Sequence, residues 1–462
     1  MATRGDTEAM DNKSVPLPAG SFKGYERNGL AALPPDDELT RVGPATPCGE
    51  YLRRFWMPIA LTSMVGELPL RLRRLGEDLV LFRDRSGKYG LLHLLCCHRN
   101  ASLEFGIVED HGIRCCYHGW LFDTDGAILE TPGEPPRSQI RDRLMQGAYP
   151  VVEHQGMIFA YFGPIAEMPR FPLFDMMDQP DNRMVPFLIP SPANWLQVFE
   201  NSIDPYHVTF LHTRVSGVQF QENLVNLPVV DYHERSSGNG VFYTSTRRIG
   251  DFVWFRVHDH MLPNFSQNGG MHVEGNAPTY FVRTGLTRWV VPVDDTNAIT
   301  IAWRHFNQET DPHGKGRPDL CGYNSVDFYG QTDQRSYEER QRNPGDYEVW
   351  CSQGPITVHA REHLAFTDSG VALYRRRLRR AIRRHRDGDR PVQPTDGVTS
   401  PVPTYGGDTV LRAPLRSNDD RGWMSELSKR VAEVYRSGDD EVGDTRRRKI
   451  REGLAGLEAT LA

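Results

Sequence analysis

Two short segments that combine cysteine with histidine constrain this chain more than any other feature of its sequence. They are Cys96–His98, which reads Cys-Cys-His, and Cys115–His118, which reads Cys-Cys-Tyr-His, with residues 99–114 between them. The chain has 7 cysteines, an odd number, and four of them stand in these two adjacent pairs. Cysteines clustered in this way indicate a metal centre more than a disulfide framework.

One cysteine of each pair is expected to bind the metal, because adjacent residues in an extended loop point to opposite sides. The spacings C-x-H and C-x-x-H favour the first cysteine of each pair, together with the histidine of its segment. The predicted ligands are Cys96, His98, Cys115 and His118. Cys97 and Cys116 are then expected to be packed thiols near the metal.

The order of these four ligands also indicates which metal they hold. A [2Fe–2S] centre with two thiolates on one iron and two imidazoles on the other needs such mixed pairs, and the imidazoles raise its reduction potential. A tetrahedral zinc ion is the alternative, since it accepts the same four ligands. Known zinc-finger spacings instead place the cysteines together and the histidines together. The sequence therefore favours the iron–sulfur cluster.

A second pair of histidines, His207 and His212, lies in the segment Glu200–His212. Non-haem Fe(II) oxygenases bind iron through two histidines and one carboxylate on one face of the metal, with open positions for O2. Side chains five residues apart diverge by about 140° on an ideal α-helix. The two histidines can therefore reach one metal only where the helix is distorted or wound as a π-bulge.

Asp204 lies three residues before His207 and on the same face of a helix. Its carboxylate is placed to accept the imidazole N–H of His207, as the partners of metal-bound histidines do. The alternative is a helix cap, because Pro205 suits the first helical position. The sequence leaves both roles open.

With these two motifs, the chain resembles the oxygenase (alpha) subunits of the Rieske non-haem iron, aromatic ring-hydroxylating oxygenases. Gly119-Trp120 after the last cluster histidine also fits that family. Four further segments resemble its phthalate dioxygenase branch: Leu39–Pro44, Phe55–Pro58, Asn194–Gln197 and Gln353–Ile356. The chain departs from the family where Cys97 replaces a usual proline and Asn100 a usual glycine. Asparagine visits left-handed backbone more readily than most residues, so Asn100 is expected to hold the same turn.

The resemblance implies further site residues and a subunit arrangement. It implies that Asp346 is the carboxylate ligand of the iron, with Glu348 as the nearest competitor and with a turn or cap role as the alternative. It places Asn201 near the iron. It also implies that Asp204 bridges a cluster histidine of one subunit, His118, to an iron histidine of its neighbour, so that the working unit is a homotrimer or homohexamer.

The implied function is that of an oxygenase component, with a Rieske [2Fe–2S] cluster and a mononuclear Fe(II) as cofactors. Electrons would come from NAD(P)H through a reductase carrying flavin and a [2Fe–2S] cluster, with or without a ferredoxin. The expected reaction is cis-dihydroxylation of an aromatic acid by O2, and the alternative is mono-oxygenation with O-demethylation of a methoxy-aromatic. An electron carrier and a ligand sensor without iron are the rival classes.

The substrate pocket is implied to draw its lining from about residues 220–310. The aromatic side chains there fit a pocket or an ordinary core: Phe242, Phe252, Trp254, Phe255 and Phe265. Three arginines of the same stretch, Arg247, Arg248 and Arg256, are candidates to hold a substrate carboxylate in a bidentate pair.

Strand and helix patterns predict a small all-β domain followed by a larger domain of mixed α and β structure. The resemblance implies an α+β fold in which the first is the Rieske domain and the second a catalytic domain with a large antiparallel sheet flanked by helices (helix-grip or START-like). The expected parts are an arm (1–44), the Rieske domain (45–165), the iron domain (166–390) and a C-terminal helical extension (391–462). Residues 79–95 read as a hairpin and 371–386 as a helix with a buried stripe at Tyr374, Leu378 and Ile382.

Composition excludes two classes of partner. With a formal net charge of -6, the chain lacks the basic excess by which proteins bind nucleic acid. No stretch approaches the roughly 18 apolar residues that would span a bilayer, and the first residues do not resemble a secretion signal. We therefore expect a cytoplasmic protein.

Overall fold

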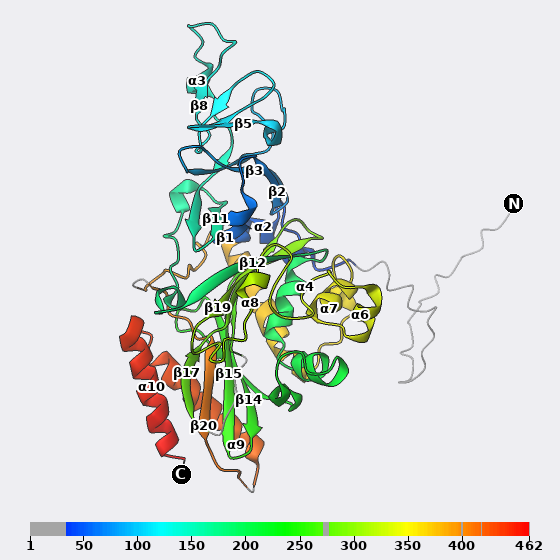
Figure 1. Ribbon diagram of the computed structural model, residues 1–462, viewed down its shortest axis with the longest axis vertical. Coiled ribbons are helices and arrows are strands. Elements are labelled where there is room, and N and C mark those ends of the chain that lie inside the picture. Colours follow the sequence, from blue (N-terminus) through cyan, green and yellow to red (C-terminus); the bar gives the residue numbers. More distant parts are fainter. Residues whose placement is uncertain (1–33, 271–276, 399–400, 417, 462) are drawn as a thin grey trace, which may run out of the picture.

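The computed structural model describes residues 34–270, 277–398, 401–416 and 418–461. The chain forms an α+β fold whose N-terminal part, made of small β-sheets, lies at the top of Figure 1, while the C-terminal helices lie at the bottom. The predicted fold class is therefore confirmed. The expected arm falls largely on residues 1–33, which lie outside the described residues.

The N-terminal part contains three small sheets, with strand orders β1-β11-β10, β2-β3-β4-β9 and β5-β6-β7-β8. Their strands are β1 (Trp56–Leu61), β2 (Leu70–Arg74), β3 (Glu77–Arg83), β4 (Tyr89–His93), β5 (Ile107–Glu109), β6 (Gly112–Arg114), β7 (Leu121–Phe122), β8 (Ile128–Glu130), β9 (Ala148–Tyr149), β10 (Val151–His154) and β11 (Met157–Tyr161). The predicted hairpin is present as β3 and β4, which pair antiparallel around the turn at Gly87.

The second part is built on one large antiparallel sheet, with nine strands in the described residues. Its main path is β12-β19-β18-β16-β15-β14-β13, while β20 pairs with both β15 and β17. The strands are β12 (Arg183–Ser191), β13 (Val229–Glu234), β14 (Gly240–Ile249), β15 (Phe252–Met261), β16 (Phe265–Asn268), β17 (Thr279–Arg283), β18 (Leu286–Pro292), β19 (Ala298–Phe306) and β20 (Gly407–Arg412).

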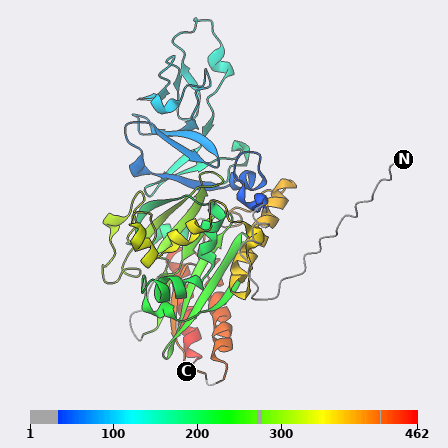
Figure 2. The same ribbon diagram turned by 90° about the vertical axis from the view of Figure 1, so that its right-hand side faces the viewer.

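Helices flank this sheet, except for α3, which lies beside β8 in the N-terminal part. The helices are α1 (Asp37–Thr40), α2 (Pro47–Leu52), α3 (Ile140–Arg143), α4 (Trp195–Glu200), α5 (His207–Thr209), α6 (Tyr337–Arg342), α7 (Asp346–Ser352), α8 (Ser369–Arg386), α9 (Asp420–Arg436) and α10 (Gly443–Ala459). In Figure 2, α8 runs along one side of the sheet, close to α1 and α2. The predicted stripe of α8 is buried, because Tyr374, Leu378 and Ile382 are at most 2% exposed.

Strand β15 shows how alternation separates the two faces of the sheet. Val253, Phe255 and Val257 join a core with α9 and α10. The intervening Trp254 packs with Val208 of α5 on the opposite face. Both faces of the strand are therefore covered.

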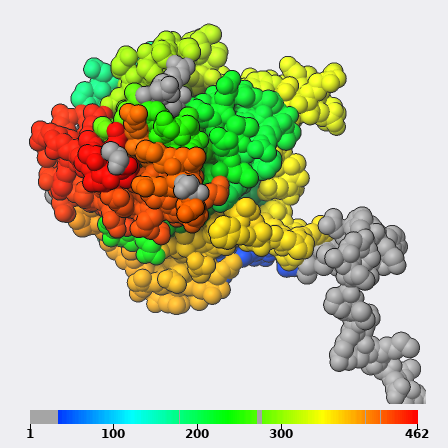
Figure 3. Space-filling model, turned by 90° about the horizontal axis from the view of Figure 1, so that it is seen from below, coloured from blue at the N-terminus to red at the C-terminus, as the bar shows by residue number. Residues whose placement is uncertain are grey.

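The C-terminal segment differs from the expected helical extension, because it also contributes β20. This strand pairs with β15 from Phe252↔Arg412 to Val257↔Gly407. Its run Asp408-Thr409-Val410-Leu411 follows a Pro-rich stretch that reads as a loop, and its pairing partner lies far away in sequence. Helices α9 and α10 follow and form one continuous surface at this end of the molecule, orange and red in Figure 3. None of the helices in the described residues combines the length and apolar character needed to cross a bilayer.

Candidate cluster loops and iron site

The two cysteine–histidine segments form two similar tight loops. In the first, the Cys96 N–H donates to Ala101 O at 2.9 Å and the Asn100 N–H donates to Cys96 O at 2.8 Å. In the second, the Cys115 N–H donates to Trp120 O at 2.8 Å and the Gly119 N–H to Cys115 O at 3.0 Å. Asn100 has φ 57° and Gly119 has φ 74°. Asn100 therefore holds the left-handed turn expected of it.

The four predicted cluster ligands converge between these loops. Cys96 and Cys115 are buried, and the rings of His98 and His118 lie 4.6 Å apart at an interplanar angle of 68°. Burial, reinforced by the neighbouring Cys115, raises the pKa of the Cys96 thiol to about 12. Nδ1 of His98 is buried and makes no hydrogen bond within the described residues. Two inward thiols and an imidazole nitrogen that lacks a protein partner fit a mixed-ligand [2Fe–2S] cluster.

The neighbouring cysteines differ from each other. Cys97 is partly buried, as expected of a packed thiol, but Cys116 is exposed. The expectation for Cys116 was wrong because its loop lies at the protein surface, so the side opposite the cluster faces solvent rather than core.

Two supports of the cluster loops escaped the sequence analysis. Trp120 stacks on the His98 ring at 4.4 Å with an interplanar angle of 2°. Gln146, only 2% exposed, accepts a hydrogen bond from Cys97 N at 2.7 Å and donates to Leu95 O at 3.0 Å. A lone glutamine carries no pattern that would reveal this bracing role.

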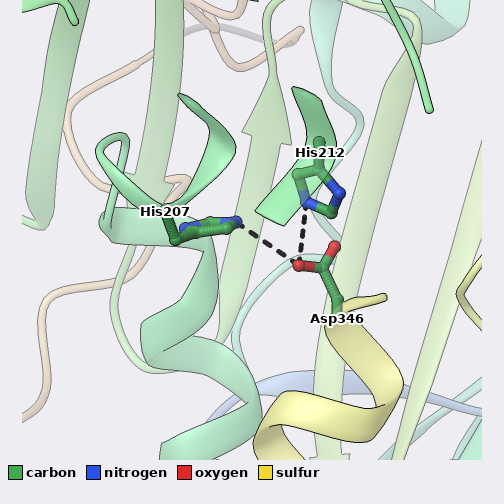
Figure 4. Close-up of side chains that lie close together, drawn as sticks. All are labelled: His207, His212 and Asp346. Atoms are coloured by element: carbon green, nitrogen blue, oxygen red, sulfur yellow. Dashed lines mark hydrogen bonds and ion pairs between the residues drawn. The ribbon is translucent and has the colours of Figure 1, made fainter. Parts of the chain in front are cut away.

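The structure also brings His207, His212 and Asp346 together (Figure 4). Nε2 of His207 lies 3.3 Å and Nε2 of His212 lies 3.0 Å from Oδ1 of Asp346. One donor atom from each residue falls within 4.8 Å of the others. Two imidazoles and a carboxylate meeting on one side of a cavity match the ligand set of non-haem Fe(II) oxygenases.

A π-helix explains how the two histidines reach one point. His207 begins α5, and the chain then winds as a π-helix over Phe210–Val215, which contains His212. The wider turn brings the two rings to 5.3 Å between centroids. The distortion that the five-residue spacing demanded is therefore confirmed.

The carboxylate candidates are separated by what they contact. Asp346 is the first residue of α7 and points to the two histidines. The Glu348 carboxylate points elsewhere, because its Oε2 accepts from the N–H of Gly345 at 2.8 Å and from Arg335 at 2.5 Å. Glu348 thus caps the helix, whereas Asp346 faces the histidines.

Three amide side chains hold this group in place. Asn201 Nδ2 donates to Oδ1 of Asp346 at 3.0 Å, and Gln331 Nε2 donates to Oδ2 at 3.0 Å. Gln219 Oε1 accepts from Nδ1 of His212 at 2.7 Å. Asn201 therefore lies beside the group as expected, while the two glutamines were missed because nothing in their local sequence marks them.

Asp204 contacts His207 and also caps the chain. Its Oδ2 lies 3.4 Å from Nδ1 of His207, and its Oδ1 accepts from Tyr206 N at 2.9 Å. Burial opposes the charged imidazole, but the neighbouring carboxylates of Asp204 and Asp346 outweigh it and raise the pKa of His207 to about 10. The two roles left open by the sequence are compatible. The Asp204 side chain remains 28% exposed, so part of it faces outward.

A cavity opens beside the triad and extends to the inner face of the sheet. It offers about 100 Å³ to the centres of water-sized molecules, several times the ~10–15 Å³ that one water needs. Its apolar walls include Val208, Phe220, Leu286 and Phe328. Of the two roles left open for the aromatic side chains of this stretch, the structure shows the core role, and the cavity lining does not include this set: Phe242, Phe252, Trp254, Phe255 and Phe265.

The three candidate arginines occupy different places. Arg256 lines the cavity. Arg247 is buried over the Trp254 ring, outside the cavity lining, and Arg248 pairs with Asp420 at 2.6 Å. Arg288, which the sequence analysis did not single out, lines the cavity beside Arg256.

Comparison with known proteins assigns the family. Residues 55–150 match the model of the Rieske [2Fe-2S] domain. The chain is 41% identical over 480 residues to the tert-butanol monooxygenase / tert-amyl alcohol desaturase oxygenase subunit of Aquincola tertiaricarbonis, covering 98% of this chain and 100% of that protein.

Two further relatives carry other activities in their names. Phenoxybenzoate dioxygenase subunit alpha of Ectopseudomonas oleovorans is 38% identical over 78% of this chain and 87% of that protein. The 5,5'-dehydrodivanillate O-demethylase oxygenase subunit of a Sphingobium species is 30% identical over 85% of this chain and 91% of that protein. The crystal structure of dicamba monooxygenase bound to dicamba is similar in fold, with a TM-score of 0.55 and 17% sequence identity. The match covers 73% of this chain and 99% of that chain.

A Rieske domain joined to a domain with a large sheet, in which helical segments bring together two histidines and a carboxylate, defines an oxygenase of the Rieske non-haem iron class. The chain belongs to the Rieske non-haem iron aromatic oxygenases, as an oxygenase (alpha) subunit. It is an oxidoreductase with a Rieske [2Fe–2S] cluster and a mononuclear iron as its cofactors.

Proposed function

We propose that this subunit inserts oxygen from O2 into an aromatic acid by cis-dihydroxylation. The observation that carries the proposal is the convergence of His207, His212 and Asp346 at the wall of a cavity with apolar sides and a charged inner end. A relative named as a phenoxybenzoate dioxygenase supports this choice of reaction and substrate. Mono-oxygenation with O-demethylation is the alternative, favoured by the relative named as an O-demethylase.

Within this proposal, the cluster is bound by the ligand set Cys96, His98, Cys115 and His118. The iron is bound by His207, His212 and Asp346, and Asn201 supports the carboxylate. When bound, the cluster supplies electrons one at a time and the iron supplies the site at which O2 is reduced. The protein side chains fix the metal ligands and hold the substrate beside them.

Asp204 is proposed to join the two metal centres of neighbouring subunits. It contacts His207 on one side and is partly exposed on the other. The cluster loops and α5 belong to widely separated parts of one chain in Figure 1. A carboxylate at this point is placed to receive His118 of a second copy, which requires a ring of subunits, as a homotrimer or a stack of two such rings.

The electron source in this proposal is a reductase with flavin and a [2Fe–2S] cluster that oxidises NAD(P)H, with or without a ferredoxin. A cytoplasmic location accompanies it. None of the seven cysteines, all of which lie in the described residues, forms a disulfide, which suits a reducing compartment.

Asp204→Asn tests the electron path. Asparagine keeps the oxygen that accepts from Tyr206 N but removes the charge next to His207. Both metals should remain bound, with about two cluster irons and about one mononuclear iron per chain, while coupled product formation is nearly abolished. The exposed Asp319→Asn serves as the control. Normal turnover in Asp204→Asn would refute the bridging role and leave Asp204 only as the acceptor that caps the chain at Tyr206 N.

Product analysis separates the two reactions. Purified subunit, supplied with a reductase, NADH and O2, is expected to convert an aromatic acid to a cis-dihydrodiol. Formation of formaldehyde from methoxy-aromatic acids alone would favour O-demethylation. A preparation that contains the iron and sulfide of the cluster but no further iron would contradict iron binding by His207, His212 and Asp346. It would favour an electron carrier.

A further inference from the structure

The wall of the iron-site cavity holds a guanidinium group whose charge has no ion-pair partner among the residues that the structure describes. Arg256 lies in β15 and is only 7% exposed. Its Nε donates to Gly270 O at 3.0 Å, and its Nη2 makes a long contact of 3.3 Å to Gly269 O. Burial lowers the pKa of Arg256. These contacts fix the direction of the side chain but leave its positive charge without an ion pair among the described residues.

A second guanidinium faces the same cavity from β18. Arg288 is 8% exposed, and its Nε donates to Ser266 Oγ at 3.0 Å. Within the described part of the chain, its two terminal nitrogens form no hydrogen bond or ion pair with the protein. Burial lowers the pKa of Arg288, the negative charge of Asp346 opposes this shift, and the positive charge of Arg256 adds to it. Two buried cations thus lie close enough to repel each other.

Other charges near the cavity are already balanced. Arg304 also lines the cavity, but it pairs with Asp327 at 3.1 Å. Asp408 stands opposite Arg256 on the neighbouring strand β20, and its Oδ1 accepts from Trp254 Nε1 at 2.8 Å. Burial raises the pKa of Asp408 to about 7, so it offsets the charge of Arg256 only in part. The excess positive charge belongs to Arg256 and Arg288.

Buried charges in proteins are normally paired, because an uncompensated charge is expensive to remove from water. Arginine also matches a carboxylate in a planar, bidentate geometry. We propose that Arg256 and Arg288 together bind the carboxylate of the substrate, and so fix which end of an aromatic acid faces away from the iron. This inference rests on the proposed function and adds the two residues that select an anionic substrate.

The rest of the cavity fits this orientation. His207, His212 and Asp346 line the same cavity, and Phe220 and Phe328 are among its apolar lining residues. A ring held by its acid group against the two strands would present its far carbons to the triad. Neutral aromatics of the same shape would leave both guanidinium groups unpaired, which disfavours them.

The test compares binding of benzoate and its neutral isostere benzamide to the anaerobic holoenzyme by titration calorimetry. Wild-type protein should bind benzoate at least about tenfold more tightly, as expected for charged hydrogen bonds. Arg256→Gln and Arg288→Gln should each weaken benzoate binding by about 10- to 100-fold and leave benzamide binding nearly unchanged. Arg376→Gln, an exposed arginine on α8, is the matched control.

Equal binding of benzoate and benzamide to wild-type protein would overturn the inference without any variant being needed. Variants that weaken both ligands equally would also overturn it, since that pattern marks general damage. Arg288→Lys keeps the charge without the planar fork and should fall between wild type and Arg288→Gln.

These outcomes separate this inference from the proposed function. An enzyme that oxidises neutral aromatics but does not prefer benzoate would be an oxygenase in which Arg256 and Arg288 do not bind a substrate carboxylate. An enzyme that binds benzoate through the two arginines yet oxidises no aromatic acid would retain this carboxylate binding and lose the proposed reaction.

Discussion

The hydrogen bond between Gln219 and His212 determines how firmly the iron site is preorganised. Oε1 of Gln219 accepts from Nδ1 of His212 at 2.7 Å, and the His212 side chain is 2% exposed. The amide orientation is settled by its other bond, because Nε2 donates to the carbonyl of Pro344 at 3.0 Å. Pro344 stands two residues before Asp346, so one glutamine links the segments that supply two of the three proposed ligands.

Gln219→Leu keeps the approximate size of the side chain and removes both bonds. The N–H of His212 then stays buried without an acceptor, at a cost of about 1–3 kcal/mol. Each ~1.4 kcal/mol corresponds to a factor of ten in affinity. Iron binding should therefore weaken roughly 10- to 100-fold, the usual effect of losing an outer partner of a metal-bound histidine.

The assay is an anaerobic Fe(II) titration of protein depleted of mononuclear iron, in competition with a chelator. The absorption of the Rieske cluster serves as an internal reference that should not change. Gln219→Glu keeps an acceptor for His212 and should bind iron about as well as wild type, and the exposed Gln308→Leu is a surface control. Wild-type affinity in Gln219→Leu would refute the view that this bond orients His212.

Three further predictions concern the cluster loops and the core. Gln146→Ala should lower the free energy of unfolding by about 2–4 kcal/mol, because the Cys97 N–H and two carbonyl groups lose their partner; urea unfolding and acid-labile sulfide measure this. Asn100→Gly should change stability little, whereas Asn100→Val should cost about 1–2 kcal/mol at φ 57° and lower cluster content. Burial lowers the pKa of His305 to about 3. The folded protein should therefore lose up to ~1.4 kcal/mol per pH unit through this group as pH falls from about 6.5 to 3, and His305→Gln should reduce that slope in urea unfolding.

The proposed metal ligands were accessible from sequence because metal coordination demands particular residue types at particular spacings. The five-residue separation of His207 and His212 even predicted the local distortion that the structure shows. The side chains that hydrogen-bond to those ligands could not be predicted from the sequence. Gln219 and Gln331 reach the site only through tertiary folding, and a glutamine at either position would look equally ordinary on a surface loop.

The sequence also could not predict which face of the large sheet lines the cavity and which face packs against α9 and α10. In β15, Phe255 belongs to the core with α9 and α10, while the next residue, Arg256, lines the cavity. Successive side chains of a strand point to opposite faces of the sheet. An alternation of apolar and polar residues identifies the core face only when the other face is exposed to solvent. Here both faces are covered, so apolar residues occur on each and the pattern does not single out the cavity.

The C-terminal segment links this architecture to the chemistry of the cavity. Strand β20 pairs along β15 and places Asp408 opposite Arg256, while α9 and α10 cover the outer face of the same strands. Without that outer layer, the strand carrying Arg256 would be covered on one face only. The layer excludes water, and Asp408 offsets the positive charge of Arg256 only in part. A negatively charged ligand in the cavity would therefore supply the missing counter-ion of Arg256. A segment that contributes none of the proposed metal ligands thereby strengthens the preference for an anionic substrate.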